Sequence, residues 1–174
     1  GHSGLARGSQ VVGFDNLLPI KGKRGILQFP VDGLVDEFPN SECGHLRSLS
    51  CRIPSGSRLF LGNSLSIREW NLAAAVGDIE SNCHVMRGAN GIDGNLSYYF
   101  GIGADWTENW AVVGDLTALY DLAGPWILDQ LPDANRRIVI MNNGGGKIFR
   151  RLPSLRTMNP SEAKVIENPH DLRF

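Results

Sequence analysis

Residues 110–122, WAVVGDLTALYDL, and residues 137–146, RIVIMNNGGG, are the most informative parts of the sequence. Each begins with a short apolar run, which is typical of a strand buried on both faces, and each run ends in Gly, Asn or Asp. A helical pattern from about Thr117 to Leu131 lies between the two runs, but Gly124-Pro125 interrupts it. An interior proline costs a helix about 3 kcal/mol, so either the helix kinks there or the proline begins a second helix.

The same alternation of strands and helices extends toward the N-terminus. Short apolar runs at residues 58–61 and 84–86 predict two further strands. Helical spacing predicts a helix that Ser41-Glu42 opens and Pro54 stops, one that Ser64 caps and that runs to Val76, and one from about Asn95. We therefore predict an α/β fold: a parallel sheet with helices on both faces.

Composition limits the possible classes of protein. The 174 residues are 42% hydrophobic and 20% charged, with a formal net charge of −1, which argues against disorder and gives no sign of a nucleic-acid-binding surface. No run of 18 apolar residues exists, so we expect no membrane span. The three cysteines are odd in number and lack CxxC spacing, which argues against a disulfide framework or a zinc site and favours a reducing, cytoplasmic location.

The chain divides near residue 40. Residues 1–40 show little periodicity, and we interpret them as a cloning scar at Gly1-His2-Ser3 followed by a linker or a remnant of a preceding domain. The basic group Lys21, Lys23 and Arg24 is interpreted as a solvated face. Residues 41–174 are predicted to form the α/β domain.

Polar and glycine-rich segments follow all four predicted strands, and ligands bind beyond the carboxyl ends of such strands. Asp115 follows one strand as either a helix cap or a metal ligand, and Asn142-Asn143 follows the next. Carboxylate, amide and backbone carbonyl oxygens are hard ligands that suit Mg²⁺. The neighbouring glycines let the backbone approach a phosphate, and the helix N-terminus after Asp115 favours an anion. This pattern predicts a site for Mg²⁺ and a diphosphate.

Four ordered blocks of the sequence carry a resemblance to a known family. GNSLSIR at 62–68, RGANGIDGNLS at 87–97, VVGDLTALYDL at 112–122 and MNNGGGKIF at 141–149 are similar to the MenD family. Its members, the 2-succinyl-5-enolpyruvyl-6-hydroxy-3-cyclohexene-1-carboxylate synthases, are thiamine-diphosphate-dependent transferases of menaquinone biosynthesis. The resemblance runs from about residue 40 to NPHDLRF at 168–174. It implies a thiamine-diphosphate-binding domain over 41–174 that is incomplete at its C-terminal side.

The resemblance also implies roles for individual residues. The cofactor-binding positions are Gly91, Ile92, Gly114, Asp115, Leu116, Thr117 and Asn143. The ligands of Mg²⁺ or Mn²⁺ are Asp115, Asn143 and the carbonyl of Gly145, with Asn142 as an alternative to Asn143 because the spacer is one residue longer than usual. The substrate-side positions are Asn63, Ser64, Arg68, Arg87, Ile148, Phe149 and Leu152. Met86, Tyr98-Tyr99 and Lys147 depart from the family pattern.

The implied reaction decarboxylates 2-oxoglutarate and adds the resulting succinyl unit to isochorismate. The glutamate that activates the cofactor is expected on another domain, usually of a partner subunit in a homodimer or homotetramer, so Glu37, Glu42, Glu69 and Glu80 receive no such role and this chain alone is expected to be inactive. Two alternatives remain open at this point. One is another thiamine-diphosphate enzyme, of the acetolactate synthase or 2-oxo acid decarboxylase type; the other is a non-catalytic oligomerising module.

Overall fold

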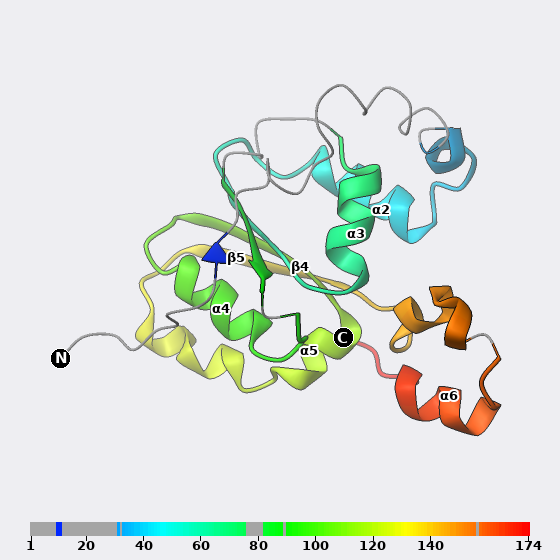
Figure 1. Ribbon diagram of the computed structural model, residues 1–174. Helices are drawn as coiled ribbons and strands as arrows, with labels where there is room; N and C mark the ends of the chain where they lie inside the picture. The colour runs from blue at the N-terminus through cyan, green and yellow to red at the C-terminus, as the bar shows by residue number, and fades with distance from the viewer. Residues whose placement is uncertain (1–9, 12–30, 32, 76–81, 89, 156) are drawn as a thin grey trace.

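The computed structural model describes residues 10–11, 31, 33–75, 82–88, 90–155 and 157–174. Strands and helices alternate along most of this length (Figure 1). The strands are β1 (Gln10–Val11), β2 (Arg58–Leu61), β3 (Cys83–Arg87), β4 (Glu108–Gly114) and β5 (Asn135–Met141). The α-helices are α2 (Glu42–Ser50), α3 (Leu65–Ala73), α4 (Asn95–Ile102), α5 (Asp115–Tyr120) and α6 (Pro160–Glu167). The 3₁₀ segments are η3 (Gly124–Gln130), η4 (Lys147–Arg151) and η5 (Pro153–Leu155).

The sheet has the order β1-β3-β2-β4-β5. Strands β3, β2, β4 and β5 are parallel, and β1 joins the edge of β3 in the antiparallel sense. The predicted parallel α/β fold is confirmed, and all four strands expected from residue 58 onward are present. In the last pair Gly114 lies opposite Met141, so the residues that follow both strands leave the sheet at the same edge.

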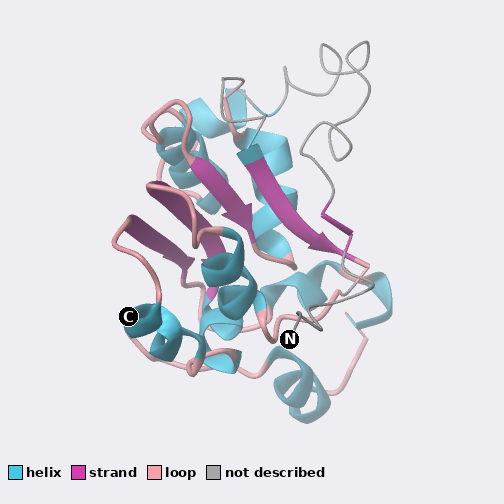
Figure 2. Ribbon diagram, turned by 90° about the vertical axis from the view of Figure 1, so that its left-hand side faces the viewer, coloured by secondary structure: helices cyan, strands magenta, loops and turns pink. Residues whose placement is uncertain are grey.

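Helices cover both faces of the sheet, as Figures 1 and 2 show. The strands are buried on both sides, so neighbouring residues point into different cores: Leu59 and Leu61 pack under α2 and α3, whereas Phe60 packs under α4 and α5. Strand β4 follows the same alternation, with Val112 on the first side and Val113 on the second. This period of two explains why each strand appears in the sequence as a continuous apolar run.

The helix predicted from about Thr117 to Leu131 is two segments. Helix α5 ends at Tyr120, and η3 follows with Pro125 in its first turn, where the missing N–H of proline removes no helical hydrogen bond. The Asp121 carboxylate accepts hydrogen bonds from the backbone N–H and the hydroxyl of Ser97, at 2.7 and 3.0 Å, and so ties this break to α4. Of the two outcomes that the sequence left open, a second helical segment is the correct one.

The two predicted serine caps behave differently. The Ser41 hydroxyl accepts a hydrogen bond from the Gly44 N–H at 3.1 Å and caps α2 as expected. Ser64 occupies the N-cap position of α3, but its φ is 75° and its side chain makes no capping hydrogen bond. The prediction that this side chain caps the helix is therefore wrong: a capping serine normally has an extended backbone, whereas Ser64 has a positive φ.

The end of the chain returns to the sheet edge. The Gly146 N–H donates to the Glu167 carbonyl at 2.6 Å, the His170 N–H donates to the Gly144 carbonyl at 3.3 Å, and the Asn142 side chain donates to the Leu172 carbonyl at 2.8 Å. Near the N-terminus, residues 31 and 33–37 are helical. The rest of the predicted linker before residue 31, including the basic group at 21–24, lies outside the described residues apart from β1. No described helix has the length and apolar character that a membrane crossing requires.

Candidate functional site

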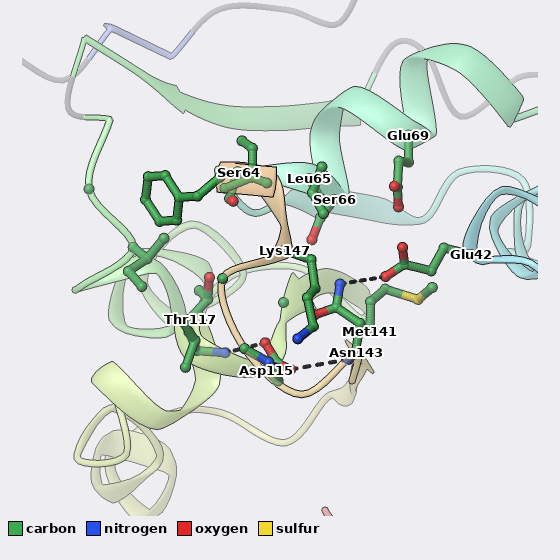
Figure 3. Close-up of a pocket in the computed structure, with 18 of the residues that line it drawn as sticks. Glu42, Ser64, Leu65, Ser66, Glu69, Asp115, Thr117, Met141, Asn143 and Lys147 are labelled. Carbon is green, nitrogen blue, oxygen red and sulfur yellow. Dashed lines mark hydrogen bonds between the residues drawn. The ribbon is translucent and has the colours of Figure 1, made fainter. Parts of the chain in front are cut away.

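A cavity of about 250 Å³ lies at the carboxyl edge of the sheet (Figure 3). Its walls come from the ends of β4 and β5, the turn after β3, the start of α3 and the first residue of α2. All of the residues predicted to bind the cofactor or the metal line it: Gly91, Ile92, Gly114, Asp115, Leu116, Thr117, Asn143 and Gly145. Segments that are far apart in sequence thus meet where the strand order predicts.

Asp115 organises one wall of this cavity. Its side chain is buried, and Oδ2 accepts the backbone N–H groups of Asn143, Gly144 and Gly145 at 3.1, 2.8 and 2.9 Å. Oδ1 accepts the N–H of Leu116 at 2.7 Å. The Nε2 atom of His170 lies 3.3 Å from Oδ2. The carboxylate therefore holds the glycine-rich turn after β5 against the end of β4.

The glycine-rich turn needs glycine at its centre. Gly144 and Gly145 have φ values of +78° and +126°, a region that L side chains rarely adopt. A Cβ atom on Gly145 would lie 2.6 Å from the Glu167 carbonyl oxygen. The two glycines let three successive N–H groups point at one carboxylate oxygen while the returning chain packs behind them.

Asn143 faces the cavity, whereas the exposed Asn142 does not line it. The Asn143 Nδ2 atom donates a 2.7 Å hydrogen bond to Oε1 of Glu42, at the start of α2. Its other amide atom, Oδ1, is buried and has no hydrogen-bond partner among the described residues. The amide thus has one satisfied end, on Glu42, and one end available to a ligand.

Glu42 lies near a second carboxyl group, that of the buried Glu69, which also lines the cavity. Glu69, on α3, is 1% exposed and accepts a 2.6 Å hydrogen bond from Arg151. Burial raises the pKa of Glu69 above its usual range, and the negative charge of the neighbouring Glu42 carboxylate adds to this rise. Two carboxyl groups therefore line the cavity with Asn143, and the exposed Arg151 pairs with the buried one.

The comparison with known proteins identifies the family. The chain is 46% identical over 141 residues to a 2-succinyl-5-enolpyruvyl-6-hydroxy-3-cyclohexene-1-carboxylate synthase of Bdellovibrio bacteriovorus, a match that covers 81% of this chain and 25% of the relative. It is 36% identical over 189 residues to the synthase of the same name from Akkermansia muciniphila, over 100% of this chain and 36% of the relative. The chain belongs to this synthase family. It spans only about a quarter to a third of the length of these curated relatives.

Two further comparisons add less. No family model matches the chain. Among solved structures, a protein of Mycobacterium smegmatis provisionally assigned to the thiamin diphosphate-dependent enzymes aligns with a TM-score of 0.45 and 19% identity, over 72% of this chain and 25% of that chain. That similarity is too low to support any statement about the site.

The residues predicted for the substrate side of a synthase of this family fall into two groups. Ser64, Ile148 and Phe149 line the cavity. The others do not: Asn63 is buried behind it and donates to the Gly91 carbonyl at 2.8 Å, Arg68 is exposed and donates to the Ser64 carbonyl at 2.5 Å, and Leu152 is 46% exposed. The side chain of Arg87 lies outside the described part of the structure. In this structure Asn63 and Arg68 stabilise the turns that form the walls.

Sequence reasoning about this synthase domain missed several lining residues. Glu42, Glu69 and Lys147 line the cavity, although none was assigned to the site. Lys147 directly follows the glycine-rich turn, and its position alone is a signal that it is near the site. Glu69 likewise directly follows the block at 62–68. Glu42 carries no such signal, because helix packing, and not chain proximity, brings it to the strand ends.

Proposed function

We propose that this chain is the cofactor-binding part of a synthase that decarboxylates 2-oxoglutarate and adds the succinyl unit to isochorismate. On this proposal the cavity at the sheet edge binds thiamine diphosphate together with Mg²⁺ or Mn²⁺. The observation that supports it most strongly is that eight predicted cofactor and metal positions, from three separate blocks of sequence, line one cavity.

The chemistry of the donor set supports a divalent metal. Asp115 supplies a carboxylate, Asn143 an amide oxygen and Gly145 a backbone carbonyl, which are hard oxygen ligands of the kind that Mg²⁺ and Mn²⁺ prefer. The buried Asn143 Oδ1 atom, which has no partner among the described residues, is a ligand position of this kind. Asp115 already accepts four backbone N–H groups, so binding of a cation there competes with, or rearranges, some of these contacts.

When bound, thiamine diphosphate supplies the carbanion chemistry that decarboxylation of a 2-oxo acid requires. The chain's own residues bind and orient the cofactor. On this proposal, the buried Thr117 hydrogen bonds the diphosphate and Ile92 provides an apolar wall, which is supported by the position of both residues in the cavity lining. Leu116, one of the predicted cofactor-binding positions, donates its N–H to Asp115, so this N–H can bind the diphosphate only if Asp115 releases it.

The substrate side extends from the same cavity. Ile148 and Phe149 form an apolar wall and Ser64 a polar one, which suits a substrate with both ring and polar parts. On this proposal, the 2-oxoglutarate and isochorismate sites and the activating glutamate are completed by other domains in a cytoplasmic homodimer or homotetramer. Arg68 and Arg87 remain candidates for substrate carboxylates, since an arginine binds a carboxylate through two parallel hydrogen bonds.

Calorimetric titration of thiamine diphosphate with Mg²⁺ tests the proposal. Asp115→Ala should abolish binding, whereas Asp129→Ala, which removes an exposed carboxylate that does not line the cavity, should leave it unchanged. Thermal unfolding of each variant checks that the fold is retained. Equal affinity for the wild type and Asp115→Ala contradicts the metal assignment, and no binding by the folded wild-type chain contradicts the proposal that these residues hold the cofactor.

A further inference from the structure

Glu42 has no part in the proposed function, yet its side chain reaches the cavity from an element 101 residues away in sequence. Its Oε1 atom accepts a hydrogen bond from Asn143 Nδ2 at 2.7 Å. Figure 3 shows the two side chains pointing toward each other, with Glu69 beside Glu42. Within the described chain, this is the contact that joins the predicted metal-ligand amide to the helix layer.

The chemistry of this contact determines which way the amide faces. A primary amide has a donor end, Nδ2, and an acceptor end, Oδ1, and the two ends occupy nearly the same space. An ionised carboxylate can only accept hydrogen bonds, so the amide must present Nδ2 to Glu42. Oδ1 is then directed away from Glu42, at the end of Asn143 that is buried and without a hydrogen-bond partner among the described residues.

An unsatisfied amide oxygen in the interior has a cost of about 1–3 kcal/mol, so its orientation needs a cause. Rotating the amide by 180° would point Oδ1 at the Glu42 carboxylate and lose the hydrogen bond. The contact with Glu42 therefore keeps the free oxygen in place before any ligand binds.

Glu42 is itself held in position. It is the first residue of α2, which Ser41 caps, and α2 packs on α3. Glu69 on α3 is almost completely buried, lines the cavity with Glu42 and accepts a hydrogen bond from Arg151 at 2.6 Å. The capped start of α2 and its packing on α3 therefore fix the backbone from which the Glu42 side chain reaches Asn143.

We propose that Glu42 is a positioning residue that orients the Asn143 amide so that Oδ1, and not Nδ2, faces the divalent cation. This inference rests on the proposed function, because it takes Asn143 as a metal ligand. Partners that orient the direct ligands of a metal commonly change its affinity by 10–100-fold when they are removed. A role of Glu42 limited to fixing α2 against the turn would change stability and leave the affinity of the folded protein for metal unchanged.

The test uses Mn²⁺ with thiamine diphosphate, and the signal of free Mn²⁺ in electron paramagnetic resonance reports binding. Four proteins are compared: the wild type, Glu42→Gln, Asn143→Ala and the double variant. Glu162→Gln, which makes the same change at an exposed position of α6, is the matched control. We expect Glu42→Gln to weaken Mn²⁺ binding by up to about tenfold, since a glutamine can donate to Oδ1 and so stabilise the reversed orientation, in which Nδ2 faces the cation.

The double variant separates a positioning role from a structural one. If Glu42 acts through Asn143, adding Glu42→Gln to Asn143→Ala produces no further loss of affinity. Metal-free NMR gives a second readout: the side-chain amide signal that disappears in Asn143→Ala should shift in Glu42→Gln and stay unchanged in Glu162→Gln.

The outcomes distinguish this inference from the proposed function. If the wild type binds Mn²⁺ and a folded Glu42→Gln variant binds it with the same affinity, the positioning role is overturned and the proposed metal site still stands. Additive losses in the double variant also overturn it. Absence of Mn²⁺ binding by the folded wild-type chain overturns both. The inference is supported if Glu42→Gln alone weakens Mn²⁺ binding, if the same change in the Asn143→Ala background causes no further loss, and if the amide signal shifts.

Discussion

The α4 face of the sheet and the cavity wall are held together by opposite kinds of interaction. The α4 face is a cluster of apolar and aromatic side chains: Phe60, Leu96, Tyr99, Phe100, Ala111, Val113 and Ala118. The cavity wall is held by directional hydrogen bonds, among them three backbone N–H groups on Asp115 and the contacts of Glu42 and Glu69. Burial of area stabilises the first region, and precise geometry stabilises the second.

The difference shows how one small domain can carry a polar site. Apolar packing does not depend strongly on direction, so the α4 face can stabilise the sheet without constraining the strand ends. Hydrogen bonds between buried polar groups constrain direction and cost free energy when they are incomplete. The molecule therefore places its directional polar contacts at the sheet edge, around the cavity.

The largest expected effect is on the α4 face. Phe100 is 1% exposed and its ring lies 5.2 Å from that of Tyr99, so Phe100→Ala should lower the free energy of unfolding by about 3–5 kcal/mol. Leu122→Ala, at a leucine that is 63% exposed, should change it by less than about 0.5 kcal/mol. Denaturant unfolding measures both. If Phe100→Ala lowered the free energy of unfolding no more than Leu122→Ala does, the contrast between the two regions would fail, because buried apolar area would then not stabilise the α4 face.

Two Gly→Ala changes are expected to have smaller effects on stability, and in opposite directions. Gly145→Ala should destabilise the protein by about 1–3 kcal/mol, because its φ is +126° and the new Cβ would meet the Glu167 carbonyl at 2.6 Å. Gly101→Ala, within α4 and with open space around it, should stabilise by about 0.5–1 kcal/mol. Thermal unfolding compares the pair. Equal shifts would show that the turn at the cavity is not geometrically constrained.

The smallest expected effect is on the pH dependence of stability, through the buried Glu69 at the cavity wall. The pKa of Glu69 is raised by burial and by Glu42, so the folded protein binds its proton more tightly than the unfolded chain does. Stability contributed by this group is therefore present below the unfolded pKa of about 4.3 and declines as pH rises through the raised folded pKa. Glu69→Gln should flatten this decline, while the facing groups Glu42, Cys43 and Arg151 remain.

Thermal unfolding across this pH range measures the effect of Glu69→Gln, with Glu162→Gln as the control for loss of an exposed charge. The control should follow the wild-type curve. A Glu69→Gln curve that is parallel to the wild type at every pH would show that Glu69 does not titrate differently on folding.

Sequence patterns predicted the strands of the sheet well, but they did not predict that Glu42 and Glu69 line the cavity. The strands were predictable because each is a short apolar run that ends at a turn residue, as at Gly114 and Asn142. The break at Pro125 was foreseen only as one of two alternatives, since the surrounding contacts decide how a proline is accommodated. Ser64 was assigned a cap that the backbone conformation prevents, because a φ of 75° has no clear signal in the residue itself.

The sequence by itself determined that Asp115 and Asn143 meet. Parallel strands joined by one crossover end at the same edge, so residues that follow them must lie together whatever the helices do. Only the tertiary structure decided which end of the Asn143 amide faces the cavity. That choice depends on Glu42, 101 residues earlier, and a contact over this separation is made by helix packing, for which no local spacing in the sequence provides a pattern.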